Sequence, residues 1–131
     1  MKSAYVVAAS ALVIGLVALG GIGFVLVARP GTGTATPAVK VSIIKGSSLS
    51  AQQQNFVPRD LVIVLGVNDT IRWINDDAYA HTVTSLGIFD SANLNPGDTW
   101  TRTFTEPGTF TYICSYHPFM KGSITVKSAG T

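Results

Sequence analysis

The residues with the clearest chemistry lie within a short stretch near the end of the chain. Cys114, the only cysteine, stands there with His117 and Met120, each three positions apart. Thiolate, imidazole and thioether groups suit copper, and a Cys with two His and a weak axial Met is typical of an electron-transfer copper site. The second imidazole must come from His81, because the chain has no other histidine. The sequence therefore predicts one copper ion bound by these four side chains.

Further motifs accompany this loop, and together they resemble the cupredoxins, the small type 1 blue copper proteins, in particular the plastocyanin- and amicyanin-like members. The short Cys-x-x-His-x-x-Met spacing of Cys114, His117 and Met120 is most similar to that of amicyanin. Thr82 is a difference, because plastocyanin and amicyanin carry Asn after the first His ligand. The resemblance covers roughly residues 38–127 and includes, in the family's order, Phe56-Val-Pro58, Trp73-Ile-Asn75, His81-Thr-Val83, Phe89-Asp90-Ser91, Pro96-Gly97-Asp98 and Gly108-Thr-Phe110-Thr-Tyr112.

The resemblance implies both a ligand set and a task. The ligands of a single type 1 copper ion would be His81, Cys114, His117 and Met120. The task would be to carry single electrons between redox proteins as copper cycles between Cu(II) and Cu(I), and the protein would not be an enzyme. In the family the second His ligand reaches solvent through an apolar patch. Here that patch implies Pro118 and Phe119 beside His117, together with Leu94 and Pro96.

The region after the first 37 residues has the pattern of an all-β domain. Short apolar and β-branched segments, such as 41–44, 61–65 and 70–74, alternate with turn residues, which is typical of a sandwich or barrel. The continuous apolar run 61–65 indicates a strand covered on both faces, and the polar segment 47–55 reads as a connection. We therefore expect a two-sheet Greek-key β-sandwich of the cupredoxin kind over residues 38–131.

The strand that leads to the cysteine predicts where the thiolate points. Alternate side chains of a strand share a face, so Phe110, Tyr112 and Cys114 are expected on the core side, with the sulfur at the edge of the core. Backbone N–H groups near Thr82 should hydrogen-bond this sulfur and adjust the potential of the metal. Gly122 is expected to form a turn that stiffens the end of the loop.

The first 29 residues differ from the rest of the chain. Residues 4–28 carry no charge, and about 25 such residues exceed the roughly 20 that a helix needs to span a bilayer. A cleaved signal peptide has an apolar core of about 7–15 residues followed by small residues, whereas Arg29-Pro30 follows here. The sequence predicts an uncleaved transmembrane helix over 1–29, with a cleaved export signal as the alternative, and a Gly/Thr/Pro linker over 30–37.

Charge predicts the surroundings and the partners of the copper domain. Lys2 before the apolar run favours a cytoplasmic N-terminus, which places the copper domain outside the cytoplasm, at the cell surface or the periplasmic side. The anchor would then keep it near membrane-bound electron-transfer complexes. Without Lys2 and Arg29 the nine basic residues become seven, equal to the seven acidic ones. Nucleic acid is excluded as a partner, because binding it requires a basic surface.

Counting ligands excludes several other metal sites. A dinuclear copper centre needs two bridging cysteines, and structural zinc needs four Cys or His ligands, whereas the chain offers one Cys and two His. Two alternatives remain open. The same ligands could store or deliver copper, or Cys114 and His117 could form a thiol enzyme, although the motif lacks the third, orienting group of such enzymes.

Overall fold

The computed structural model describes residues 37–130, which form nine strands. Among these residues no helix is long and apolar enough to cross a membrane. The predicted N-terminal helix over 1–29 and nearly all of the predicted linker over 30–37 lie outside the described residues.

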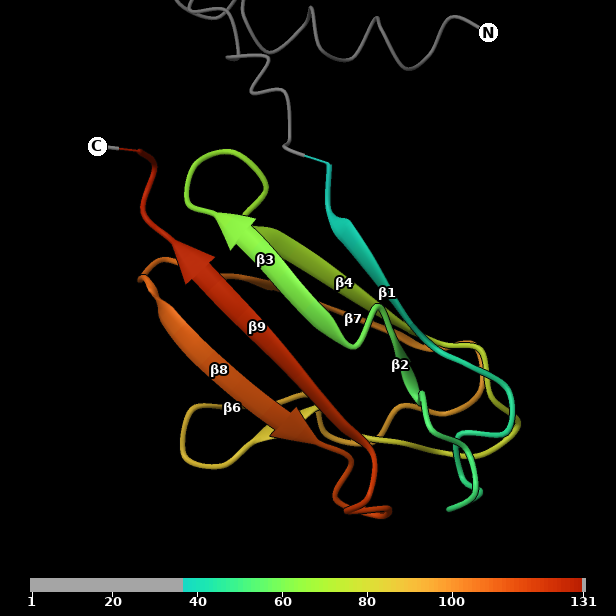
Figure 1. The fold of residues 1–131 in the computed structure, drawn as a ribbon. Helices are drawn as coiled ribbons and strands as arrows, with labels where there is room; N and C mark the ends of the chain where they lie inside the picture. Colours follow the sequence, from blue (N-terminus) through green and yellow to red (C-terminus); the bar gives the residue numbers. More distant parts are fainter. Residues whose placement is uncertain (1–36, 131) are drawn as a thin grey trace, which may run out of the picture. The chain divides into compact units, whose positions relative to one another are not determined.

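The strands form two sheets, as predicted for an all-β sandwich (Figure 1). One sheet has the order β2-β1-β4-β7 and the other β3-β9-β8-β5-β6. The pairs β1–β4 and β3–β9 are parallel and the remaining pairs are antiparallel. The strand bounds are β1 (Val39–Ile43), β2 (Phe56–Val57), β3 (Asp60–Val64), β4 (Thr70–Asn75), β5 (Thr84–Ser85), β6 (Phe89–Asp90), β7 (Thr99–Thr103), β8 (Gly108–Ile113) and β9 (Lys121–Lys127).

Alternating side chains of both sheets fill the space between them. Trp73 of β4 is fully buried and lies against Trp100 of the neighbouring strand and Tyr112 of the opposite sheet, with ring centroids 5.1 and 5.8 Å apart. Aromatic pairs at such distances add to the stabilisation that comes from burying their area. The core continues to the cysteine, and its buried apolar members include Val41, Ile43, Phe56, Ile63, Ile71, Val83, Phe89, Cys114, Met120 and Ile124.

The run 61–65 forms a strand as expected, but the expectation that both faces are covered is wrong. Ile63 is fully buried, whereas Val62 is 54% exposed. The reason is the two-layer architecture, in which only the inner face of each sheet packs against the other sheet. One face of this strand therefore packs on the core and the other faces solvent, which is common in antiparallel and mixed sheets.

Gly122 does not form a turn, contrary to the expectation from sequence. It lies in β9, directly opposite Tyr112 of β8. A Cβ atom at Gly122 would lie 2.3 Å from the Tyr112 ring, so the absent side chain makes room for the aromatic ring. This cross-strand pair keeps β8 and β9 close together just before and after the loop that joins them.

Candidate metal centre

The β8–β9 connection, which lies at the opposite end of β9 from the C-terminus (Figure 1), is a tight loop closed by its own backbone. The N–H of His117 donates to the carbonyl of Cys114 (3.2 Å), and the N–H of Met120 donates to the carbonyl of His117 (2.8 Å). The N–H of Cys114 in turn donates to the carbonyl of Met120 (3.2 Å). Each of the three residues is therefore bonded to the other two, and their side chains start from fixed positions.

His81 comes from another part of the chain and is fixed by a separate pairing. Its N–H donates to the carbonyl of Leu94 (3.0 Å), and the N–H of Leu94 donates to the carbonyl of His81 (2.8 Å). The side-chain amide of Asn75, itself fully buried, donates to the same Leu94 carbonyl (2.9 Å). Folding thus brings His81, from the long connection after β4, to the end of β8.

The two imidazoles meet the thiolate with the same ring nitrogen. Nδ1 of His81 lies 3.6 Å from Cys114 Sγ, and Nδ1 of His117 lies 3.7 Å from it. The ligand atoms of the three residues all lie within 4.8 Å of one another, with His81 and Cys114 fully buried and His117 half-buried. Nitrogen and sulfur ligands bind metals at about 2.0–2.3 Å, so one ion can contact the sulfur and both nitrogens. The donor set fits copper, which takes Cys and His ligands together.

Thr82 supplies the hydrogen bond to sulfur that the sequence predicts. Its backbone N–H donates to Cys114 Sγ (3.3 Å), and its hydroxyl accepts the N–H of Ser115 (2.8 Å). The hydroxyl also lies 2.9 Å from that of Thr84. The Thr found where relatives have Asn therefore still joins the segment of His81 to the segment of Cys114.

These contacts favour the ionised cysteine. Burial opposes ionisation of Cys114, but the adjacent His81 ring, the hydrogen bond from the Thr82 N–H and the adjacent His117 ring outweigh it and lower the pKa of the thiol to about 6. Burial also opposes the charged form of His81, yet the adjacent Cys114 and Asp77 raise its pKa. Metal binding requires a thiolate, so the site is electrostatically prepared for a cation.

Comparison with known proteins decides the family. The family model described as the cupredoxin-like domain matches residues 18–126. The chain belongs to the cupredoxin family. Amicyanin from Paracoccus denitrificans is 39% identical over 67 residues, which cover 47% of this chain and 51% of that protein. Amicyanin-alpha from Methylorubrum extorquens is 35% identical over 63 residues, covering 44% and 53%. The chain thus spans about half the length of these curated relatives.

Solved structures agree with this cupredoxin fold. A purple cupredoxin from Nitrosopumilus maritimus matches with a TM-score of 0.61 and 31% identity, over 68% of this chain and 99% of that one. An oxidized amicyanin variant matches with a TM-score of 0.56 and 29% identity, over 71% and 85%. Structures of amicyanin in the Cu(I) form are among the matches. The predicted fold is therefore confirmed, and copper as the cofactor is supported by both the family and the donor set of this cupredoxin.

Met120 and the exposed residues beside His117 are the remaining residues that the sequence assigned to the site. Met120 is fully buried at the end of the ligand loop, as an axial ligand would be. Phe119 is 39% exposed, and its ring centroid lies 5.8 Å from that of His117. Pro118 is also exposed, so the apolar surface expected beside His117 is present. The expectation for Leu94 is wrong, because its pairing with His81 buries it to 4% exposure.

Asp77 is the residue that sequence reasoning missed. Its carboxylate oxygen Oδ2 lies 2.7 Å from His81 Nε2, and both side chains are buried. Burial opposes ionisation of Asp77, but the bonds from His81 and from the N–H groups of Gly46 and Ala78 lower its pKa. The signal in the sequence was an acidic residue four positions before the first His ligand, since a ligating His usually donates its second N–H to a carboxylate or carbonyl.

Proposed function

We propose that this chain is an electron carrier, not an enzyme, that holds one type 1 copper ion with His81, Cys114, His117 and Met120. The observation that carries the proposal is the convergence of two Nδ1 atoms on the buried sulfur of Cys114, 3.6 and 3.7 Å away. The ion would supply one-electron chemistry by alternating between Cu(II) and Cu(I). The residues of the chain would hold the ligands in place and provide a route for the electron.

The first contribution of the chain is rigidity. Cys114, His117 and Met120 are tied to one another by three backbone hydrogen bonds, and His81 is tied to Leu94 by two. Ligands held in this way keep their positions when the charge of the site changes. Little rearrangement is then needed during transfer, which keeps the barrier low, in line with the general value of a preorganised site.

The second contribution is a route for the electron. His81, Cys114 and Met120 are fully buried, whereas His117 is half-buried and lies beside exposed Phe119. His117 is therefore the ligand nearest to solvent. The apolar residues around the edge of its ring suit a small, short-lived contact with a redox partner. Backbone donation from Thr82 to the sulfur stabilises negative charge on Cys114 and so adjusts the potential.

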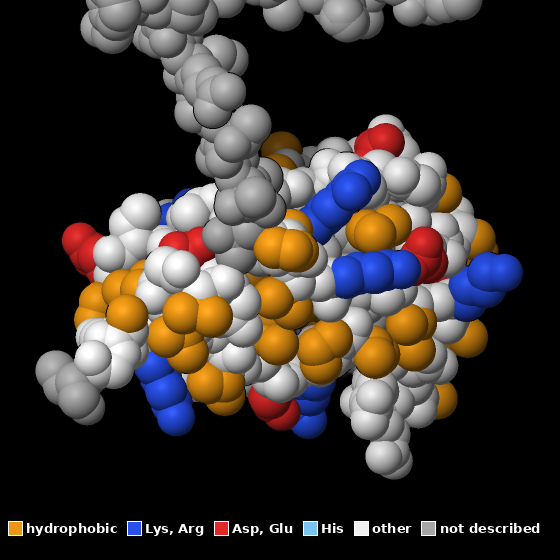
Figure 2. Space-filling model, turned by 90° about the horizontal axis from the view of Figure 1, so that it is seen from above, with side chains coloured by type: hydrophobic (Ala, Val, Ile, Leu, Met, Phe, Trp, Pro, Cys, Tyr) orange, Lys and Arg blue, Asp and Glu red, His pale blue; other side chains and the backbone are white. Residues whose placement is uncertain are grey.

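The partner would be a redox protein, and the charge distribution supports recognition by apolar contact. The copper domain has equal numbers of acidic and basic residues. Figure 2 shows the end of the sandwich opposite the β8–β9 loop, and on that face Lys and Arg side chains are interspersed with Asp and Glu instead of forming a patch of one sign. Strong electrostatic steering requires such a patch. For location we propose attachment to the outer side of a membrane, near membrane-bound complexes, on the basis of the uncharged run 4–28.

A visible absorption spectrum of the full chain loaded with Cu(II) tests the proposal. We expect an intense band from thiolate-to-copper charge transfer, and we expect Cys114→Ser to abolish it while the fold is retained by circular dichroism. Rapid, reversible bleaching by a one-electron reductant is expected of a carrier. A chain that binds zinc and refuses copper would overturn the copper site, and slow copper exchange with no electron transfer would support storage or delivery instead.

A further inference from the structure

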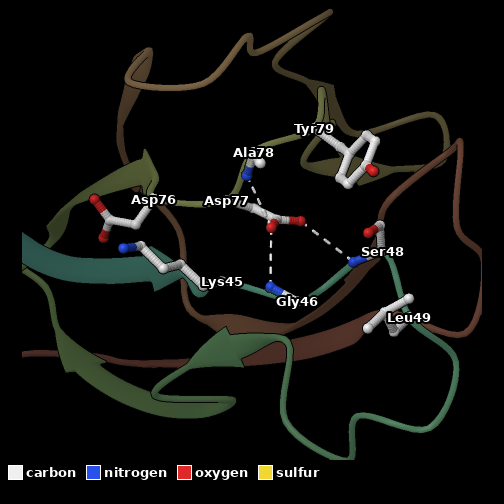
Figure 3. Close-up of a pocket in the computed structure, with 8 residues that line it drawn as sticks. All are labelled: Lys45, Gly46, Ser48, Leu49, Asp76, Asp77, Ala78 and Tyr79. Atoms are coloured by element: carbon white, nitrogen blue, oxygen red, sulfur yellow. Dashed lines mark hydrogen bonds between the residues drawn. The ribbon is translucent and has the colours of Figure 1, made fainter.

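The buried carboxylate of Asp77 has four hydrogen-bond partners within the protein. Oδ1 accepts the backbone N–H of Gly46 (2.9 Å) and of Ala78 (2.8 Å). Oδ2 accepts the N–H of Ser48 (3.3 Å) and lies 2.7 Å from His81 Nε2 (Figure 3 shows the three backbone bonds). The side chain is only 3% exposed, so these four partners, and not water, satisfy the group.

The surroundings fix Asp77 from two directions. On its own segment, the N–H of Asp77 donates to the side-chain oxygen of fully buried Asn75 (3.0 Å). From the β1–β2 connection come the N–H groups of Gly46 and Ser48. That connection is itself braced, because the Ser47 hydroxyl donates to the carbonyl of Asn55 (3.0 Å) and the Asn55 amide donates to the carbonyl of Ser47 (3.1 Å). The carboxylate therefore has one orientation.

We infer that Asp77 is the positioning residue of the first copper ligand: it holds the His81 ring in the tautomer with hydrogen on Nε2 and leaves Nδ1 free for the metal. An ionised carboxylate can only accept hydrogen bonds, so the short contact with Oδ2 requires His81 Nε2 to donate. In a neutral imidazole the other nitrogen then carries a lone pair. That nitrogen is the one 3.6 Å from Cys114 Sγ. The metal role rests on the proposed function, but the tautomer does not.

The backbone donors explain why the carboxylate must be an aspartate. If an amide replaced it, one oxygen would become an NH₂ group, and that group must face either the N–H groups of Gly46 and Ala78 or those of Ser48 and His81. An NH₂ group that faced Gly46 and Ala78 would replace two short hydrogen bonds by contacts between donors. The orientation with the NH₂ group toward Ser48 and His81 is therefore favoured. The amide would then donate to His81 Nε2 and shift the hydrogen to Nδ1, the atom that the metal needs.

Nitrogen-15 NMR of the metal-free full chain at alkaline pH, where the imidazole is neutral, tests the inference directly. In the wild type we expect His81 as the single tautomer with hydrogen on Nε2 and none on Nδ1. Asp77→Asn should lose this state, with the hydrogen mainly on Nδ1. The matched control is Asp76→Asn, because the neighbouring Asp76 accepts from the Ser42 hydroxyl and makes no bond to His81. A wild type with hydrogen on His81 Nδ1, or an unchanged tautomer in folded Asp77→Asn, overturns the inference.

Copper binding provides the second measurement. Loss of such a supporting partner typically costs about 10- to 100-fold in metal affinity, so Asp77→Asn should bind Cu(II) that much more weakly than Asp76→Asn. Its reduction potential should rise, because a less basic imidazole favours Cu(II) less. Equal affinity and potential in the two variants would overturn the positioning role. A wild type that binds no copper would instead overturn the proposed function and leave the tautomer result standing.

Discussion

The hydroxyl of Thr82 accepts a hydrogen bond from the backbone N–H of Ser115, with 2.8 Å between the two heavy atoms. Thr82 follows the ligand His81 and Ser115 follows the ligand Cys114, so this bond joins the two segments that bring ligands from distant parts of the chain. The backbone N–H of Thr82 adds a second link, to Cys114 Sγ. A hydroxyl can accept this bond in place of the Asn side chain that amicyanin and plastocyanin carry.

The first prediction concerns this link. Thr82→Val keeps the size of the side chain and the backbone bond to sulfur, but removes the acceptor of the Ser115 N–H. We expect the free energy of unfolding of the metal-free chain to fall by about 1–2 kcal/mol, the usual cost of a lost hydrogen bond with one partner left behind. Urea denaturation measures it, and Thr82→Ser, which keeps the hydroxyl, is the control. An unchanged stability of the Val variant, which keeps the methyl group, would contradict the role of the hydroxyl.

The second prediction concerns the axial ligand. Met120 is fully buried at the end of the ligand loop, and the axial ligand tunes the potential of such copper sites. Met120→Gln offers a harder oxygen donor that favours Cu(II), so the reduction potential should fall. Met120→Leu is the control, because it preserves burial without any donor and should raise the potential. Voltammetry that gives an unchanged or raised potential for the Gln variant would count against Met120 as a ligand.

The sequence predicted the parts of the site that depend on residue type and local spacing. Cys114, His117 and Met120 share one loop, and alternation along β8 correctly placed Tyr112 and Cys114 on the buried face. His81 followed from the histidine count. The role of Asp77 was missed because it depends on N–H groups of Gly46 and Ser48, which stand far away in the sequence and meet the carboxylate only after β1 and β4 have paired.

Errors about individual side chains have the same origin in tertiary structure. Val62 was expected to be buried, because an apolar run does not reveal that only one face of β3 packs against the other sheet. Leu94 was expected at the surface, because the residues next to it in the sequence do not indicate that its backbone pairs with His81. Gly122 was read as a turn residue, whereas its lack of a side chain accommodates the ring of Tyr112 on the adjacent strand.

The third prediction follows from that contact. In Gly122→Ala the new Cβ would lie 2.3 Å from Cζ and 2.4 Å from the hydroxyl oxygen of Tyr112. The ring must move within the core, and overpacking of this kind typically costs 1–3 kcal/mol, so the free energy of unfolding should fall by about that amount. Gly130→Ala is the control, since a Cβ there meets nothing within 4 Å. Equal stability of the two variants in denaturant titrations would contradict the packing argument.

The fourth prediction concerns the first 29 residues. An uncharged run of about 25 residues that is followed directly by Arg29-Pro30 should stay attached and hold the full chain in the membrane fraction. Fractionation, followed by mass spectrometry of the N-terminus, measures this. A variant without residues 1–29 should be soluble. Mature protein that begins near residues 31–38 and is found soluble would show that the segment is a cleaved export signal.

The fifth prediction concerns where electrons reach the site. Phe119→Asp changes no ligand, so the visible spectrum should stay almost unchanged. A charge placed within the contact surface must lose water when the partner binds, and a cost of about 1.4 kcal/mol would slow electron exchange roughly tenfold. The control is Val67→Asp: Val67 is 62% exposed and lies in the β3–β4 connection, at the other end of the sandwich from the β8–β9 loop (Figure 1).

Stopped-flow reduction by membranes that contain the redox partner separates the two variants. Only Phe119→Asp should be slow if electrons enter beside His117, whose ring lies 5.8 Å from that of Phe119. Rates of the wild type should change only mildly with ionic strength, because salt screens interactions between exposed charges and the domain has no net charge to steer the encounter. Wild-type rates in Phe119→Asp, or a steep dependence on salt, would move the contact away from the ligand loop to a charged face.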